Sequence, residues 1–491
     1  MKNFAKLLVV ALVITLAASF LTIGSSAAVN DPRYLKPGSD SVVFVMDAPE
    51  NGELPGDGTG TSPENPLKPI DHELYDPEAT DPRRYYQTAL YQATEMLQET
   101  GGTIVIMGKV NLSQDDLYGT GGTTCEFYSA QFKTNTIKFT SVWNGIDYRE
   151  TNGAKLEIEF PAMVGIHGQT IWENIDIATI GTQRLIAFNH WTTLVGEGVN
   201  CYPSDDMYAG IPSYYISLSG GHRFRGGNDV QENIVVQSGT YNRLVGGVWG
   251  VNNKRVYKDD GTLSYTNNLD GVSMINLTIE GTTTVLGAIS GTVFQNSEFS
   301  GNVNITINSG TFKCDIYGVG STGVMNKDGV VMFKINGGDF KEAWVLEPVI
   351  SGYINNAPTG RLLDFSGWTG DKEGLAAAYK LASEAATEFT NIKFPEGVTA
   401  EELASLSGVT TPPPTVETAT PSGDETTGYN NNNGPLVIGG DDTDENVAVG
   451  NTGNSNLGLI IGIAAGVLVI FGVLIAVIVI MAKKMKQQDK K

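Results

Sequence analysis

The sequence LTI at 277–279 recurs as ITI at 305–307 and as FKI at 333–335, so the last isoleucine of each copy stands 28 residues after the previous one. A glycine turn follows each copy: Gly281, then SGTF at 309–312, then GGDF at 337–340. A fixed period of short β segments and glycine turns is typical of a solenoid, in which each repeat buries its apolar side against the next. A β-sandwich with coincidental spacing is the alternative.

Other short β segments surround this repeat. An earlier copy, VVQSGTY at 235–241, lies 43 residues upstream of the first, and a polar insert around 254–270 accounts for the longer step. Short apolar runs bounded by turn residues predict further strands. These predicted strands are 42–46, 103–107, 137–140, 156–160, 172–177, 215–218 and 234–237.

The composition agrees with an all-β fold. Among 491 residues, 59 are glycine and only 18% are charged, a mixture that disfavours a helical bundle and favours short strands with tight turns. The formal net charge is −22. Nucleic-acid binding needs clustered lysine and arginine to neutralise phosphates, so the acidic balance argues against that class of partner.

Two apolar segments predict the cellular location. Residues 1–28 combine a basic start, an apolar run and small residues before a cleavage point, which is the pattern of a secretory signal peptide. Residues 457–482 carry no charge and, at about 1.5 Å per residue, are long enough to cross a bilayer as a helix. The basic segment 483–491 follows directly, so we expect a cytoplasmic tail, an extracellular body and a single-pass type I protein at the cell membrane.

Two further features belong to this membrane-proximal region. Gly458, Gly462 and Gly466 recur at four-residue spacing, which allows two membrane helices to approach closely and predicts a possible homodimer. Residues 409–456 contain mainly Thr, Pro, Gly, Asn and acidic residues, so they predict a disordered stalk beneath the extracellular domain 29–408.

A solenoid has open ends that need to be covered. An amphipathic stripe predicts a helix over 85–100, which suits one end of the repeat array. A second helical region, 371–408, suits the other end. It closes with a short helix in which Thr399 and Glu402 form a capping box and Gly408 ends the helix.

The stretches VFVMD at 43–47, GTSPENPL at 60–67 and GGTIV at 101–105 resemble the first coil of pectate-lyase-like right-handed β-helix proteins. The block TSVWNGIDYR at 140–149 is similar to one in large, mostly uncharacterised surface proteins of Gram-positive bacteria with this fold. The resemblance, which covers about 40–350, implies a right-handed parallel β-helix. It implies little about activity, because unrelated functions share the fold.

Catalytic candidates are sparse. Asp205 lies beside Asp206 after a predicted strand, where a solvated turn residue is the simpler interpretation. A glycine-rich segment gathers a histidine, two arginines and an aspartate, which can bind a uronate carboxylate and supply a base, or form a polar turn. Polysaccharide lyases of the family that the chain resembles use Ca²⁺. We find no metal-ligand cluster in the sequence, and we expect no cofactor unless the protein is such a lyase. The candidates in that segment are His222, Arg223, Arg225 and Asp229.

Aromatic residues offer a second kind of site. If exposed, their rings can stack on sugar rings; if buried, they are core residues or turn plugs. Cys125, Cys201 and Cys314 are few and widely spaced, so they form no disulfide framework and permit at most one bridge. The aromatic candidates for ligand binding are Trp143, Trp191, Trp249, Tyr214 and Tyr215.

Taken together, the pattern predicts a membrane-anchored surface protein that presents a β-helix. Our first hypothesis is a binding or adhesion module for extracellular glycan or a neighbouring cell surface. The second is a polysaccharide lyase or glycoside hydrolase with its site near 205–229, and the third is a structural spacer in the cell envelope. The sequence does not identify a ligand or substrate.

Overall fold

We analysed a computed structural model of the chain, which separates into two compact units, 1–418 and 419–491. All described residues belong to the first unit. The structure describes residues 31–47, 55–68, 88–112, 124–127, 135–159, 163–166, 168–182, 184–188, 192–221, 231–248, 256–257, 263–264, 274–292, 298–299, 301–320, 324–325, 329–349, 360–384 and 389–408.

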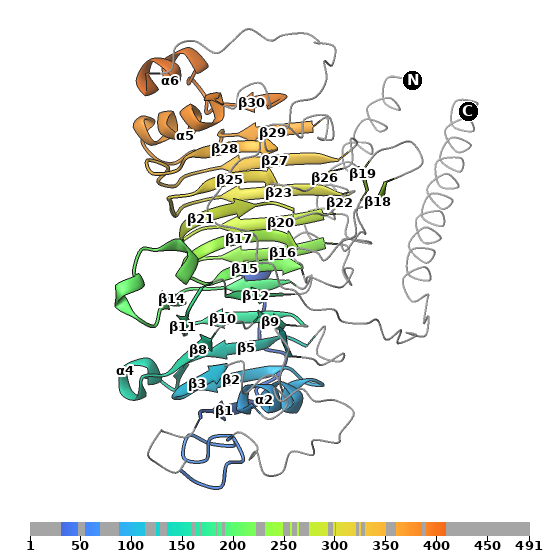
Figure 1. The fold of residues 1–491 in the computed structure, drawn as a ribbon, viewed down its shortest axis with the longest axis vertical. Helices are drawn as coiled ribbons and strands as arrows, with labels where there is room; N and C mark the ends of the chain where they lie inside the picture. Colours follow the sequence, from blue (N-terminus) through green and yellow to red (C-terminus); the bar gives the residue numbers. More distant parts are fainter. Residues whose placement is uncertain are drawn as a thin grey trace, which may run out of the picture. The chain divides into compact units, whose positions relative to one another are not determined.

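The largest element is a parallel sheet of eleven strands, which stack in sequence order from β1 to β30 in Figure 1. Parallel strands need a crossover between them, and here each crossover contributes strands to other sheets. The strands are β1 (Val42–Val45), β2 (Gly102–Ile106), β5 (Ile137–Thr140), β10 (Thr170–Glu173), β13 (Thr193–Val195), β16 (Gln231–Val236), β20 (Met274–Ile279), β23 (Asn302–Ile307), β27 (Val330–Ile335), β29 (Gly360–Asp364) and β30 (Asn391–Lys393).

A second parallel sheet has nine strands, and a third has four. The nine are β4 (Thr124–Phe127), β9 (Met163–Ile166), β12 (Leu185–Ala187), β15 (Ser217–Gly221), β17 (Thr240–Val248), β21 (Thr284–Ser290), β24 (Thr311–Phe312), β25 (Asp315–Val319) and β28 (Val345–Val349). The four are β3 (Lys109–Leu112), β8 (Lys155–Glu159), β11 (Asp176–Ile180) and β14 (Asn200–Pro203). Small pairs are β6 (Val142–Trp143) with β7 (Ile146–Asp147), β18 (Val256–Tyr257) with β19 (Leu263–Ser264), and β22 (Glu298–Phe299) with β26 (Val324–Met325).

The predicted repeat is confirmed by the strand register. Ile279 pairs with Ile307, which pairs with Ile335, and all three side chains are fully buried. Along β20 and β23 every second residue is buried, so one face of the sheet forms the core and the other faces outward. The described chain is therefore mostly β, with long parallel sheets consistent with a β-solenoid-like fold.

The glycine turns stack in the same way as the strands. Gly239, Gly310 and Gly338 occupy matching positions and have φ angles of 100°, 125° and 124°, a region that other residues rarely adopt. The aromatic residue two positions further on turns inward. Phe312 and Phe340 stack with ring centroids 4.9 Å apart, which explains why the motif ends in an aromatic residue.

Two ladders of polar side chains run across these repeats. On the outward face of the eleven-stranded sheet, Asn304 Nδ2 donates to Asn276 Oδ1, and Asn276 Nδ2 donates to Asn233 Oδ1, each at 2.8 Å. At the ends of the strands, Asn308 Nδ2 donates to Glu280 Oε2 at 2.8 Å, and Asn336 Nδ2 donates to Asn308 Oδ1 at 2.7 Å. Stacked amides satisfy one another only when the repeats keep a constant register.

Helices lie beside the first and the last strands (Figure 1). Near β1 and β2 lies α2 (Ala89–Leu97), and near β28 to β30 lie α5 (Lys372–Glu384) and α6 (Ala400–Ser407). The helix predicted to start at 85 starts at Ala89, because Thr88 Oγ1 caps it by accepting from Tyr91 N. The other helical elements are η1 (Pro32–Tyr34), α4 (Tyr148–Asn152), η5 (Asp206–Tyr208) and η6 (Pro212–Tyr214).

The predicted caps of the last helix are largely confirmed. Thr399 Oγ1 accepts from Glu402 N, and Gly408 ends α6 in the left-handed conformation with a φ of 71°. The Glu402 carboxylate has a different partner from the one that a complete capping box requires. Its Oε1 lies 2.6 Å from Lys372 Nζ, so it links α6 to α5.

The predicted strand 172–177 is wrong in one respect, because it is two strands. β10 ends at Glu173 and β11 begins at Asp176, so the two belong to different sheets. Asn174 between them has a φ of 49°, a left-handed conformation that asparagine tolerates and that turns the chain.

Several predicted segments lie outside the described residues. These are the signal peptide 1–28, the stalk 409–456, the membrane segment 457–482 with its glycines, and the tail 483–491. Within the part of the chain that the structure describes, no helix combines the length and apolar character needed to span a membrane.

Candidate functional site

A loop leaves the sheets between β14 and β15 and projects from the neighbouring strands (Figure 1). It contains η5 and η6, and it is tied down at its base. Thr179 Oγ1 donates to the backbone oxygen of Tyr214, and Gly210 N donates to the phenol oxygen of Tyr215 at 3.1 Å. The loop is therefore a fixed surface feature, and we call residues 204–216 the tyrosine loop.

The tyrosine loop carries a stacked aromatic pair. The rings of Tyr208 and Tyr214 lie 3.8 Å apart at an interplanar angle of 6°. Next to them, Met207 is 67% exposed and Ile211 is 43% exposed. The neighbouring Tyr214 phenol raises the pKa of Tyr208 above its ordinary value. Large apolar groups outside the core are available to a ligand.

The other predicted aromatic sites have different surroundings. Tyr215 is buried and takes part in the base of the loop. Trp143 is half-buried in the hairpin of β6 and β7, where its ring meets Phe44 edge-to-face at 6.0 Å. Trp191 and Trp249 lie outside the described residues. Among the predicted aromatic residues that are described, Tyr214 alone combines a surface loop with a stacked neighbour.

The catalytic candidates are not brought together by the described residues. Asp205 Oδ1 accepts from Met207 N at 2.9 Å and caps η5, which is a turn role. His222, Arg223, Arg225 and Asp229 lie outside the described residues, so the predicted cluster stays a prediction.

Two of the three cysteines are structural. Cys201 and Cys314 are free and buried, with no bridge between them. Burial raises the pKa of the Cys201 thiol to about 12 and raises the pKa of Cys314 even further, so neither is a nucleophile near neutral pH. The side chain of Cys125 lies outside the described residues.

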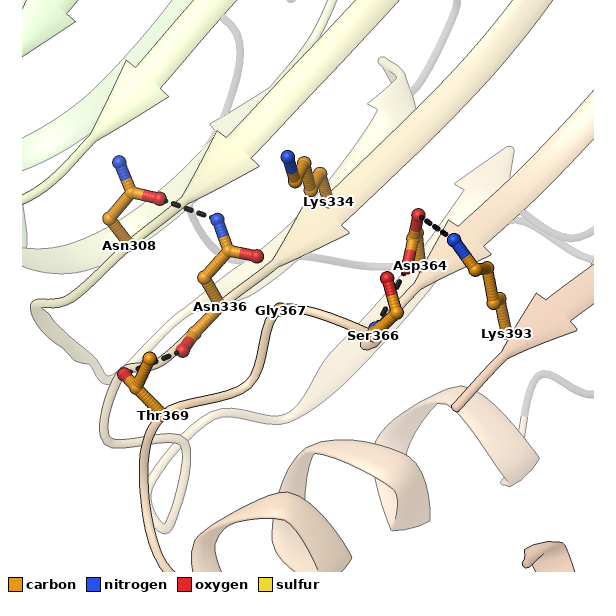
Figure 2. A pocket seen from close by; sticks show the side chains of 8 residues that line it. All are labelled: Asn308, Lys334, Asn336, Asp364, Ser366, Gly367, Thr369 and Lys393. Carbon is orange, nitrogen blue, oxygen red and sulfur yellow. Dashed lines mark hydrogen bonds and ion pairs between the residues drawn. The ribbon is translucent and has the colours of Figure 1, made fainter. Parts of the chain in front are cut away.

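A polar hollow of about 560 Å³ lies at the C-terminal end of the eleven-stranded sheet (Figure 2). Sequence reasoning did not identify it. Its volume is within the range of about 300–1,000 Å³ that small-molecule sites occupy. No apolar side chain lines it; the lining residues are Asn308, Lys334, Asn336, Asp364, Ser366, Gly367, Thr369 and Lys393.

One wall of the hollow is the end of the second amide ladder. Asn336 donates to Asn308, and the backbone oxygen of Asn336 accepts from Thr369 N at 2.8 Å and from Thr369 Oγ1 at 3.1 Å. At Gly367 a side chain has no room, because a Cβ there would lie 2.1 Å from Asn336 Oδ1. The two asparagines are thus held in place.

The opposite wall carries the charges. Lys334, Asp364 and Lys393 occupy one row across β27, β29 and β30, since Lys334 pairs in register with Asp364 and Asp364 with Lys393. Lys393 Nζ lies 3.5 Å from Asp364 Oδ2, and Asp364 Oδ1 accepts from Ser366 N at 2.8 Å. Burial opposes ionisation, but hydrogen bonds from Ser366 and the charge of Lys393 outweigh it and lower the pKa of Asp364.

Lys334 is the unbalanced charge of this row. Its side chain is exposed, and it forms no ion pair with any residue that the structure describes. With Asp364 neutralised by Lys393, the hollow has one net positive charge in a chain whose formal net charge is −22. The register of the repeat contained the signal, because Lys334 stands 28 residues after Thr306 on the same outward row.

A second charged cluster covers the four-stranded sheet. Glu157 is only 7% exposed at its side chain and pairs with Lys109 and with Lys155, the latter at 3.0 Å. Burial opposes ionisation, but the two ammonium groups outweigh it and lower the pKa of Glu157. All three charges have partners, so this cluster forms a structural ion-pair network.

Beside it, Arg149 links two parts of the sheet. Its guanidinium binds the Asp147 carboxylate at 2.5 Å and the backbone oxygen of Gly198 at 2.7 Å. Its Nη1 lies 3.8 Å from Asp176 Oδ1, and the Tyr202 phenol donates to Asp176 Oδ2 at 3.3 Å. Desolvation raises the pKa of Asp176.

Comparisons with protein-family models, with curated proteins and with solved structures found no match to this chain. Among the described residues, no group of three or more His, Cys, Asp or Glu side chains is arranged to hold a metal ion.

Proposed function

We propose that the chain is a cell-surface protein whose extracellular part is a right-handed parallel β-helix of the pectate-lyase-like kind. The parallel register of the repeats and the helices beside the first and last strands support this proposal. The apolar segment 457–482 anchors the protein, and the stalk 409–456 separates the anchor from the β-helix.

The β-helix binds extracellular glycan, and the half-buried, stacked Tyr208–Tyr214 pair on the surface loop carries this proposal. Sugar rings present flat faces of C–H groups, and aromatic rings on a rigid surface bind such faces at a low cost in conformational entropy. Here the rings are already stacked 3.8 Å apart before any ligand arrives. Glycans of the cell's own envelope or of a neighbouring cell are the partners.

A glycan array tests the proposal with the full-length protein in detergent micelles. We expect hits that weaken by about tenfold in Tyr208→Ala and Tyr214→Ala, because each change removes a ring from the pair. Tyr34→Ala is the matched control: Tyr34 is 70% exposed in η1 and belongs to no stacked pair among the described residues.

Two results would overturn the proposal. Absence of any hit favours the spacer hypothesis, and hits that survive both loop substitutions place the binding surface elsewhere. Assays for unsaturated products and for reducing sugars on the same glycans test the enzyme hypothesis independently. Turnover in either assay would replace binding by lyase or hydrolase activity.

A further inference from the structure

The side chains that line the hollow in Figure 2 favour one kind of ligand. Its amides are linked in a ladder, since Asn336 Nδ2 donates to Asn308 and Asn308 Nδ2 donates to Glu280, while Asn336 Oδ1 is buried without a hydrogen-bond partner among the described residues. They form a fixed wall. The charged groups that line the hollow are the Lys334 ammonium and the Asp364–Lys393 pair.

We propose that this hollow binds a sugar unit that carries one negative charge, such as a carboxylate or a sulfate ester. Lys334 pairs with the anionic group, and the Asp364 carboxylate and Lys393 ammonium bind ring hydroxyls. This inference rests on the proposed function only in that the ligand is a glycan; it concerns a site remote in sequence from the tyrosine loop.

The charges of the hollow support this choice over a neutral sugar. An exposed ammonium with no described counter-ion gains a charge-assisted hydrogen bond when an anion arrives. In a chain with a formal net charge of −22, an anionic ligand is repelled by most of the surface, so a local positive site is needed to admit it.

The paired strands that carry Lys334, Asp364 and Lys393 hold these three residues at fixed positions. Lys334, Asp364 and Lys393 project from neighbouring parallel strands, which lie about 4.8 Å apart. That spacing is close to the separation of equatorial substituents on alternate carbons of a sugar ring, so two such groups of one unit reach adjacent strands. Ser366 N fixes the Asp364 carboxylate by a 2.8 Å hydrogen bond.

Calorimetric titration of the full-length protein with three probes tests the inference. The probes are glucose, glucuronate and a sulfated glucose, which share the same ring. We expect both anionic probes to bind about tenfold more tightly than glucose and to lose this advantage in Lys334→Gln. Lys341→Gln is the control, because Lys341 is also exposed and does not line the hollow.

Asp364→Asn separates ring recognition from charge attraction. We expect it to weaken all three sugars, because an amide replaces the carboxylate acceptor, while inorganic sulfate is bound no more weakly. Sulfate that binds as tightly as the sulfated sugar shows an adventitious ion only and overturns the inference. Equal affinity for glucose and glucuronate also overturns it.

The two proposals fail in different ways. If Lys334→Gln leaves the affinities for the three probes unchanged while Tyr214→Ala abolishes hits on the array, the hollow is not a site and the glycan-binding function stands. If the array is blank while Lys334 still governs affinity for the anionic probes, the tyrosine loop is not the binding surface and the hollow is.

Discussion

Repeats in the N-terminal half of the solenoid-like domain, from β2 to β15, send the chain from the eleven-stranded sheet through the four-stranded sheet to the nine-stranded sheet. Repeats in the C-terminal half, from β16 to β28, pass directly from the eleven-stranded sheet to the nine-stranded sheet through a glycine turn such as 308–310. This half contains the two 28-residue steps, from β20 to β23 and from β23 to β27, and the amide ladders. The half with the extra strand has variable steps and buried or half-buried ion pairs.

This difference shows that identical side chains stack where the strand register is kept, across the 28-residue step from Asn276 to Asn304 and equally across the 43-residue step from Asn233 to Asn276. In the N-terminal half unlike residues meet across strands, and opposite charges such as Lys138 in β5 and Glu173 in β10 become neighbours. We therefore expect the C-terminal half to depend on packing and the N-terminal half to respond to pH.

The largest expected effect follows from removing a stacked ring. Phe312→Ala deletes a fully buried side chain that stacks on Phe340, and we expect it to lower the free energy of unfolding by about 3–5 kcal/mol. Phe139→Ala is the counterpart in the N-terminal half, where Phe139 stacks on Trp172 at 4.4 Å. Urea unfolding measures both losses.

Hydrogen exchange of the same two variants then tests whether the halves are independent. Each repeat contacts mainly its neighbours, so protection should fall near the substituted strand and persist in the other half. Uniform loss of protection in both variants would show one cooperative unit. The outward-facing Thr306→Ala is the control, with an expected change within about 0.5 kcal/mol.

A smaller effect is expected at the turn that defines the C-terminal half. Gly310→Ala places a Cβ 2.8 Å from the Thr283 backbone oxygen at a φ of 125°, so we expect a loss of about 2–3 kcal/mol in urea unfolding. Gly397→Ala separates the two causes, since Gly397 has a φ of 75° but open space around it. It should lose only about 1 kcal/mol; equal losses would mean that crowding at the turn is unimportant.

The smallest expected effect depends on pH and belongs to the N-terminal half. The lowered pKa of Glu157 means that its ion pairs stabilise the fold above the carboxyl's ordinary pKa, and that this contribution is lost as the pH falls through the lowered value. Glu157→Gln should therefore cost about 1–2 kcal/mol at pH 7 and progressively less below about pH 4. A difference that does not shrink in acid would mean that shape, and not charge, makes Glu157 important. Unfolding curves at several pH values measure it.

The regular half could be predicted from the sequence because its signals are local and repeated. The 28-residue spacing of Ile279, Ile307 and Ile335 predicts the strand register directly. The glycines two positions before Phe312 and Phe340 predict the turns. The four-stranded sheet was not anticipated. Its corner at Asn174 is marked by neither glycine nor proline, so a two-sheet path looked like one strand.

The candidate sites divide in a similar way. Tyr214 was identified as an aromatic residue, but its stacking on Tyr208 depends on a loop whose path no short pattern encodes. The hollow was missed because Lys334, Asp364 and Lys393 are about 30 residues apart in sequence and meet only through strand register. Pairing is a property of the whole parallel sheet.

The two buried thiols have a practical consequence. Cys201 lies in β14 of the N-terminal half and Cys314 next to β25 of the C-terminal half, and neither is accessible in the folded chain. With Cys125 replaced by serine, the rate at which each remaining thiol is alkylated measures how often its own half of the domain opens. The molecule thus contains an internal pair of reporters, one for each half.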